Sequence, residues 1–334
     1  MALLPLIGAI GSGNCAIVKG SEHTPNTNEV LKKIFSSFDS DHLAFLCGDA
    51  EQSRELVKLP FDKIFFTGST AVGKKVLAAA AENLTPVVLE LGGKSPCIVD
   101  KSANIKLTAR RIVWGKFMNA GQTCIAPDFV LAHTSVHHAL IIAMIKEIEE
   151  LFGVDSSLSP HYGKIIHEKA WDRLIDLIDE NKVKYGGKFD KSSLFISPTI
   201  LDNVEINDKC MREEIFGPIL PILTYENEED LPIFLSKEKP LAMYVFGSIS
   251  WAQSIINKFP SGGACINDTM IHFSNSKLPF GGIGASGLGH YHGYTSFLCF
   301  THQRSIMWSF TWIDLFFRYP PFRYFATIKH LFRF

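Results

Sequence analysis

The stretch Lys63-Ile64-Phe65-Phe66-Thr67-Gly68-Ser69-Thr70-Ala71-Val72-Gly73 decides the fold class. It begins as a short apolar strand, passes through a segment bounded by two glycines, and leads into residues 74–83, which we expect to be helical. Similar elements surround it, namely strands at 15–19, 43–47 and 86–89, a helix at 28–38 preceded by Ser21 as its N-cap, and a helix at 52–58. This alternation predicts an α/β fold with a parallel sheet, in which ligands bind beyond the carboxyl ends of the strands.

The rest of the chain continues the same architecture. A helix is expected over 102–119, and apolar residues recur on one face of 136–152, so that this second helix should cover a sheet. Trp171, Leu174, Ile175 and Ile178 repeat that helical pattern. Strands are expected at 219–225, 241–247 and 264–267. We interpret the apolar stripes as core.

Composition excludes several classes of function. The 334 residues are 46% hydrophobic and 20% charged, which is typical of a globular protein with a large core. The net charge of −1 argues against a nucleic-acid partner. Seven cysteines are scattered singly, which favours a reducing compartment over a disulfide framework. The histidines and cysteines show no metal-ligand spacing, so we expect no metal.

The segment Gly68–Gly73 lies where a predicted strand ends and a helix begins. Backbone N–H groups at the start of that helix could bind a phosphate. The segment is neither a G-x-G-x-x-G motif nor a P-loop, because no Lys-Ser/Thr follows the second glycine. A purely structural turn is therefore an equal alternative at this point.

The octet Phe117-Met118-Asn119-Ala120-Gly121-Gln122-Thr123-Cys124 places a cysteine shortly after a glycine. A backbone bend there could present the sulfur to a cleft, where a thiolate would be a nucleophile. Most free cysteines are small buried hydrophobes, and on the octet alone that alternative is favoured.

Two acidic sites accompany the cysteine. Glu90 follows an apolar strand in Leu89-Glu90-Leu91-Gly92-Gly93-Lys94, and burial would raise its pKa and suit it to base catalysis near neutral pH. The alternative is a surface pair between Glu90 and Lys94. Glu213 and Glu214 precede a tight turn and by themselves indicate little, because most acidic pairs are simply solvated.

Taken together, these motifs resemble those of the aldehyde dehydrogenases. The matching segments occur in the family's order: Thr67–Gly73, Glu90-Leu91-Gly92-Gly93-Lys94, Gly121-Gln122-Thr123-Cys124, Glu214-Ile215-Phe216-Gly217-Pro218 and Pro279-Phe280-Gly281-Gly282. The resemblance covers about residues 5–305. Within the family, Lys94–Cys97, Trp114–Asn119 and Tyr291-His292-Gly293 look like class 3 enzymes, among which the fatty aldehyde dehydrogenases are most similar.

The resemblance implies an aldehyde dehydrogenase-like fold with a partial Rossmann-type cofactor domain and an α/β catalytic domain. The implied divisions are a truncated NAD-binding domain at 1–90, a catalytic domain at 91–276, an active-site loop with a return and oligomerisation segment at 277–305, and an aromatic, basic tail at 306–334.

The resemblance also implies a reaction. Cys124 would attack the aldehyde, expected to be a medium- or long-chain fatty aldehyde, and form a thiohemiacetal. Hydride transfer to NAD would leave a thioester, which Glu90 would hydrolyse through an activated water. The implied cofactor contacts are Lys19, Glu22, Gly68, Ser69, Thr70, Ala71, Val72, Gly73, Glu214 and Phe216. NADP is an alternative cofactor, although Glu22 should disfavour its 2′-phosphate.

Two departures from the family pattern suggest impaired activity. The segment that precedes Met1 in the family is absent, and with it an asparagine that completes the oxyanion hole; one such donor is typically worth on the order of 10²–10³ in rate. Gly20 replaces a usual proline and should loosen the turn that aims Lys19 and Glu22. Two alternatives stay open: a cofactor-independent thiol esterase, and a truncated, non-catalytic partner subunit.

The C-terminal tail predicts a contact of its own. Residues 322–334 are too short to span a bilayer, but they combine Phe325, Leu331, Phe332 and Phe334 with Arg323, Lys329 and Arg333. This composition fits an interfacial membrane segment as well as a strip packed over the substrate entrance. We expect a cytoplasmic homodimer that contacts the endoplasmic reticulum membrane peripherally.

Overall fold

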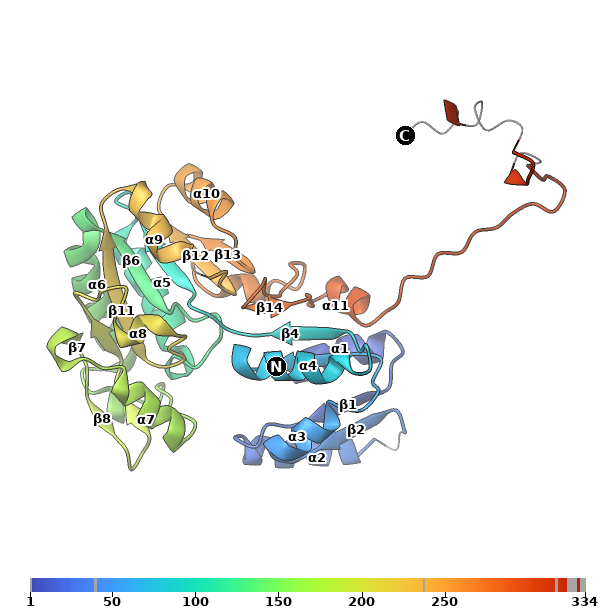
Figure 1. The fold of residues 1–334 in the computed structure, drawn as a ribbon. Helices are drawn as coiled ribbons and strands as arrows, with labels where there is room; N and C mark the ends of the chain where they lie inside the picture. The colour runs from blue at the N-terminus through green and yellow to red at the C-terminus, as the bar shows by residue number, and fades with distance from the viewer. Residues whose placement is uncertain (1, 39–40, 237, 316–317, 323–328, 331–334) are drawn as a thin grey trace. The chain divides into compact units, whose positions relative to one another are not determined.

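The structure is a computed structural model that describes residues 2–38, 41–236, 238–315, 318–322 and 329–330 (Figure 1). The chain forms two compact units, Met1–Phe300 and Thr301–Phe334. The tail residues Phe325, Leu331, Phe332, Phe334, Arg323 and Arg333, on which the interfacial prediction rests, lie outside the described residues.

The helices are α1 (Leu3–Gly11), α2 (Pro25–Ser36), α3 (Ala50–Leu56), α4 (Thr70–Ala81), α5 (Ile105–Phe117), α6 (Thr134–Phe152), α7 (Glu168–Asp176), α8 (Lys209–Arg212), α9 (Leu231–Leu235), α10 (Ile249–Lys258) and α11 (Tyr294–Cys299). The strands are β1 (Ala16–Lys19), β2 (Leu43–Leu46), β3 (Ile64–Thr67), β4 (Val87–Glu90), β5 (Pro96–Val99), β6 (Phe129–His133), β7 (Val183–Tyr185), β8 (Phe189–Asp190), β9 (Phe195–Ile196), β10 (Thr199–Leu201), β11 (Ile219–Tyr225), β12 (Ala242–Phe246), β13 (Gly263–Ile266) and β14 (Gly287–Leu288).

The predicted parallel α/β architecture is confirmed. A seven-stranded sheet has the order β13-β12-β5-β6-β11-β10-β7 and is parallel except for β7. A smaller sheet, β14-β4-β3, pairs β3 with β4 in parallel and receives β14 antiparallel. The parallel pair β1-β2 forms a separate sheet. Strands β5 and β6 were not predicted, because both are short runs that are buried except for His133 at the end of β6, without the alternation that marks a half-exposed strand.

The main core lies around the seven-stranded sheet. The predicted apolar face of α6 is confirmed, since Leu140, Ile141, Met144 and Ile148 are all buried. Helices α5 and α6 pack against each other, and α6 covers β6 and β11 (Figure 1). A second, small cluster joins α4 to β3 and β4 through Val76, Ala80 and Leu89. The small sheet and the large sheet therefore each have their own apolar support.

Two helix starts were predicted wrongly. Helix α2 begins at Pro25, with Thr24 rather than Ser21 in the N-cap position, because a proline with its fixed φ suits the first helical turn. Helix α4 begins at Thr70 and is capped by Ser69, whose Oγ accepts a hydrogen bond from the Val72 N–H. Most of the Gly68–Gly73 segment is thus the first turn of a helix rather than a separate loop.

The second unit carries an exposed apolar stretch. Met307 and Trp308 are 90% and 91% exposed, and Phe310 and Trp312 are also largely exposed. In the described part of the chain, no helix has both the length and the apolar character that crossing a membrane would require.

Candidate active site

The predicted catalytic segments come together where the two larger sheets meet. Strand β4 ends at Glu90, and residues 91–95 lead directly to the start of β5 at Pro96. Because β5, β6 and β11 run parallel, their amino ends lie at the same edge of the large sheet. The carboxyl edge of the small sheet therefore adjoins the amino edge of the large one, and the loops at this junction form the candidate site (Figure 1).

Glu90 is buried in this junction, with a residue exposure of 1%. Its backbone pairs with Thr67 on one side and Gly287 on the other, and its carbonyl accepts a hydrogen bond from the Gly68 N–H. Neither carboxyl oxygen has a hydrogen-bond partner within the described residues. Burial raises the pKa of Glu90 to about 8. The predicted burial and raised pKa of this acid are confirmed, and the alternative of a surface pair with Lys94 is wrong.

A left-handed turn delivers the cysteine. Asn119, Ala120 and Gly121 have φ values of 53°, 51° and 73° in succession. Such a conformation is costly for residues other than glycine and persists only where the surroundings fix it. The Gln122 side chain does so, because its Nε2 donates to the Asn119 and Lys164 carbonyls at 3.0 Å and its Oε1 accepts from the Ile166 N–H at 2.9 Å. The predicted backbone bend is confirmed.

Cys124 is half-buried at the end of this loop. Burial, followed by the negative charges of Glu214 and Glu90, raises the pKa of its thiol to about 12. The backbone N–H groups of Cys124 and Ile125 act in the opposite direction. The Glu90 and Glu214 carboxyl groups are therefore close enough to Cys124 to affect the charge of its thiol, and the structure brings the three side chains together.

Glu214 lies on the loop between α8 and β11. A Cβ atom placed on Gly92 would be 2.1 Å from the Glu214 Oε2, so the carboxylate rests directly on the glycine pair that follows Glu90. Burial, then the charge of Asp128, raises the pKa of Glu214 to about 8, while a hydrogen bond from the Gly93 backbone opposes this. Phe216, two residues on, has a φ of 48° and is 41% exposed.

The start of α4 lies beside Glu90. The Thr70 Oγ1 donates to the Ala285 carbonyl at 3.1 Å, which places the turn next to the segment 277–305, where the active-site loop was predicted. Gly73 allows close packing, since a Cβ there would be 2.6 Å from Leu91. Val72 is 44% exposed. The first turn of a twelve-residue helix is thus open beside a buried carboxyl group, an arrangement that suits a phosphate.

Lys19 is the last residue of β1, which belongs to a different sheet from β3, and Glu22 lies in the turn that follows β1. Lys19 Nζ and a Glu22 carboxylate oxygen are 2.9 Å apart, and this hydrogen bond lowers the pKa of Glu22. Gly20, between them, donates its N–H to the Leu46 carbonyl at 2.9 Å, and its Cα packs against Asn28. A proline at position 20 could not make that hydrogen bond, so in this chain glycine anchors the turn instead of loosening it.

The sequence analysis missed several charged residues at the junction. Asp128 and Lys116 are 3% and 1% exposed, and burial lowers the pKa of Lys116 to about 8. Arg173 of α7 donates hydrogen bonds to the Glu214 and Ile215 carbonyls at 3.3 and 2.5 Å. The sequence feature that could have identified these residues is a charged side chain inside an otherwise apolar stretch, such as Asp128 directly before β6.

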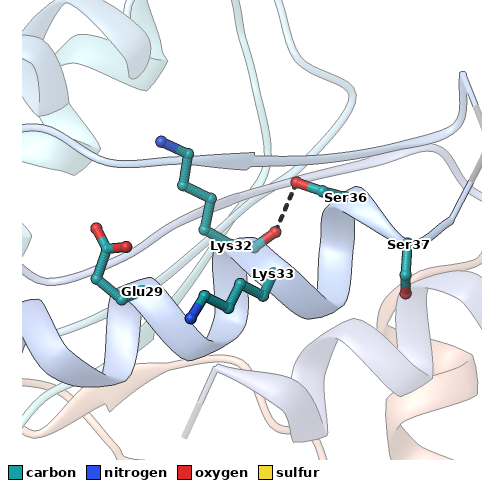
Figure 2. A pocket seen from close by; sticks show the side chains of 5 residues that line it. All are labelled: Glu29, Lys32, Lys33, Ser36 and Ser37. Carbon is teal, nitrogen blue, oxygen red and sulfur yellow. Dashed lines mark hydrogen bonds between the residues drawn. The ribbon is translucent and has the colours of Figure 1, made fainter.

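A pocket elsewhere on the molecule has a different character. Figure 2 shows it on α2, lined by Glu29, Lys32, Lys33, Ser36 and Ser37. All five residues come from one helix and its end, and none belongs to the predicted site. This pocket has charged side chains, but they come from a single helix, whereas several strands and loops meet at the candidate site. In the described ranges, no three His, Cys, Asp or Glu side chains are grouped so that they could hold a metal ion.

Comparison with known proteins agrees with this geometry. The model of the aldehyde dehydrogenase family matches residues 1–306. The chain belongs to the aldehyde dehydrogenase family. The segments that carry Glu90, Cys124 and Glu214 all lie within the matched range.

Two relatives indicate the part of the family concerned. The 4,4'-diaponeurosporen-aldehyde dehydrogenase of Staphylococcus aureus is 47% identical over 98% of this chain and 73% of its own length. Aldehyde dehydrogenase family 3 member A2 of Mus musculus is 45% identical over 91% of this chain. This chain spans 63% of the mouse protein, which is less than two thirds of that relative.

Solved structures give the same family and fold. The substrate-bound state of Staphylococcus aureus AldH matches with a TM-score of 0.96 and 46% identity, over 99% of this chain and 74% of that one. An NAD-dependent aldehyde dehydrogenase from Sinorhizobium meliloti matches with a TM-score of 0.84 and 26% identity, over 93% and 64%. The aldehyde dehydrogenase fold predicted from the motifs is thereby confirmed.

Proposed function

We propose that this protein oxidises aldehydes to carboxylic acids with NAD, using Cys124 as nucleophile and Glu90 as general base. One observation carries the proposal: the buried Glu90 carboxyl group has no hydrogen-bond partner among the described residues, and it lies near a thiol that a left-handed loop holds in place. A structural carboxylate would have partners, because burying an unpaired polar group is costly. The orphaned Glu90 is better explained by a group that binds there during the reaction.

The residues around the junction fit a dinucleotide. The open first turn of α4, with Gly68 to Gly73, would hold its phosphates through backbone N–H groups. Lys19 and Glu22 would contact a ribose, and Glu214 with Phe216 would hold the nicotinamide end. Bound NAD would supply a hydride acceptor and a positively charged ring. A Glu22 carboxylate beside the ribose disfavours the 2′-phosphate of NADP. We therefore expect a lower KM for NAD than for NADP, which steady-state kinetics with both would test.

Cys124 and Glu90 would each carry out a different step of the reaction. The Cys124 sulfur attacks the aldehyde carbon to give a thiohemiacetal, and the backbone N–H groups of Cys124 and Ile125 lie beside the sulfur. Loss of hydride from that carbon leaves a thioester on Cys124. Glu90, as carboxylate, takes a proton from water, which attacks the thioester and releases the acid.

Apolar aldehydes of medium or long chain are the proposed substrates. Trp114 and Met118, on the stretch that leads to Cys124, are 41% and 40% exposed although they are large and apolar. Ile271 is 47% exposed and lies two residues after Thr269. The Thr269 hydroxyl oxygen lies against Gly115 of α5, the helix that leads to the Cys124 loop. Large apolar side chains exposed near a polar site are typical of a surface that binds apolar ligands.

NADH formation from a medium-chain aliphatic aldehyde tests the activity. The wild-type protein should produce NADH, and Cys124→Ser should reduce the rate by on the order of 10³-fold or more, because the covalent intermediate is lost. Cys47→Ser, which changes an exposed free cysteine, is the matched control and should keep the wild-type rate. Ester hydrolysis without NAD, in a protein that forms no NADH, would instead identify a thiol esterase.

We further propose the domain division predicted above. The segment 277–305 contains β14, which joins the sheet of β3 and β4, so a return of the chain to the cofactor-binding part has physical support. A homodimer is proposed on the family resemblance, and one relative carries the name "aldehyde dehydrogenase, dimeric NADP-preferring". Analytical ultracentrifugation would test it, and a single species of monomer mass would contradict it.

A cytoplasmic protein with peripheral membrane contact is the proposed location. The exposed Met307, Trp308, Phe310 and Trp312 extend the aromatic character of the tail toward its start. Flotation with liposomes should recover the full chain and leave a chain ending at Ser305 behind. Equal recovery of the two would contradict membrane contact through the tail.

A further inference from the structure

Asp128 lies on the segment that carries Cys124 and contacts the loop after Glu90 and the loop that carries Glu214. It lies four residues after Cys124 and its residue exposure is 3%. Its Oδ1 accepts a hydrogen bond of 2.8 Å from the Ile215 N–H, next to Glu214. Its Oδ2 pairs with Lys94, four residues after Glu90, and its own N–H donates to the Ser95 carbonyl at 2.8 Å. One buried carboxylate thus connects the loops of all three site residues.

Lys94 completes the connection. Besides its ion pair with Asp128, its Nζ donates to the Cys210 carbonyl at 2.8 Å and to the Glu213 carbonyl at 3.0 Å. The lysine therefore bridges the loop after Glu90 to both ends of the segment 210–213. These three contacts engage the Lys94 ammonium group away from Glu90, so within the described residues the alternative of a Glu90–Lys94 pair does not occur.

The loop that carries Glu214 depends on these contacts. It lies between α8 and β11, outside any helix or strand, and includes the positive φ of Phe216. Apart from Asp128 and Lys94, the side chain that holds its backbone in the described residues is Arg173, through the Glu214 and Ile215 carbonyls. Removing the Asp128 carboxylate leaves the buried Ile215 N–H without its acceptor and the Lys94 ammonium without its counter-charge. A displacement of about 1 Å in a positioning loop can cost on the order of 10²-fold in rate.

We propose that Asp128 is a positioning residue that fixes Glu214 and Cys124 relative to Glu90, through its hydrogen bond to Ile215 and its ion pair with Lys94. This inference rests on the proposed function for its catalytic consequence. Its structural content, the fixed geometry of the 213–216 loop, stands apart from any activity and can be measured separately.

Three variants test the inference by kinetics. Asp128→Ala removes both contacts and should lower kcat/KM by on the order of 10²-fold, with a rise in the KM for NAD as Glu214 moves. Asp128→Asn keeps an oxygen for the Ile215 N–H but loses the charge that faces Lys94, and should fall between the wild type and Asp128→Ala. The control is Asp100→Asn: Asp100 is also buried and accepts hydrogen bonds from Ser102 at 2.9 and 2.5 Å, but it follows the opposite end of β5. Its kcat and KM should stay at wild-type values.

Hydrogen exchange of the protein without ligands separates the two proposals. The Ile215 amide should exchange faster in Asp128→Ala than in the wild type, and Asp100→Asn should leave it unchanged. Faster exchange in a protein that never forms NADH would support the positioning role and sink the proposed function. Unchanged exchange together with unchanged KM for NAD in Asp128→Ala would overturn the inference. If Asp128→Ala does not fold, Asp128→Asn, which has nearly the same volume, carries the same comparison.

Discussion

Cys124 and Glu90 are both held in their neutral forms by their surroundings at neutral pH. Burial raises the pKa of Glu90 to about 8, and burial with the charges of Glu214 and Glu90 raises that of Cys124 to about 12. A neutral pair costs less to bury than two anions. At neutral pH both groups therefore remain protonated and uncharged. The Cys124 thiol and the Glu90 carboxyl group must each lose a proton before the proposed aldehyde oxidation can proceed.

The pH dependence of turnover follows from Glu90. Below its pKa of about 8 the protonated carboxyl cannot accept a proton from water, so thioester hydrolysis should rise with pH through about 8 and then level off. Glu90→Gln should lower the rate by about 10²–10⁴-fold and abolish this rise. Single-turnover rates of acid release across this pH range would measure it. A rise that persists in Glu90→Gln would assign the titration to another group, of which Glu214, with a similar pKa, is the nearest candidate.

At the scale of elements, the strands and helices near β3 and β4 could be predicted because short apolar runs alternate with clear helical patterns. In the seven-stranded sheet, β11, β12 and β13 were predicted. Strands β5 and β6 were not, because they are buried on both faces and their residues show no alternation of apolar and polar side chains. Glu90, Cys124 and Glu214 came from family motifs. Asp128 and Arg173 could not be assigned in this way, because their contacts join residues that lie 34 to 87 positions apart in the sequence. Local sequence patterns do not encode contacts of that kind.

The left-handed turn before Cys124 makes a prediction at this scale. Gly121→Ala should destabilise the protein, because a left-handed alanine costs about 1–2 kcal/mol and its Cβ would lie 2.2 Å from the Gly217 carbonyl oxygen. Activity should fall as well, since the turn aims the thiol. The control Gly11→Ala, at the end of α1 with open space around its Cα, should be neutral or stabilise by about 0.5–1 kcal/mol. Urea unfolding and NADH formation would measure both, and wild-type stability in Gly121→Ala would show that the turn is not constrained.

Within the unit of residues 1–300, the three-stranded sheet and the seven-stranded sheet meet at the candidate site. The carboxyl edge of the small sheet supplies Glu90 and the start of α4, and loops at the amino edge of the large sheet supply Cys124, Asp128 and Glu214. Each half alone lacks either the proposed base, Glu90, or the proposed nucleophile, Cys124. The proposed chemistry therefore depends on how the chain passes from β4 to β5, through the glycine pair that Glu214 rests on.

Trapping the covalent intermediate tests this account most directly. Glu90→Gln, incubated with NAD and a medium-chain aldehyde, should gain the mass of the aldehyde less two hydrogens, and peptide mapping should place this acyl group on Cys124. No such adduct should form without NAD or in the Glu90→Gln/Cys124→Ser double variant. An acyl group on another residue, or no adduct in a folded Glu90→Gln protein that binds NAD, would contradict the assignment of Cys124 and Glu90.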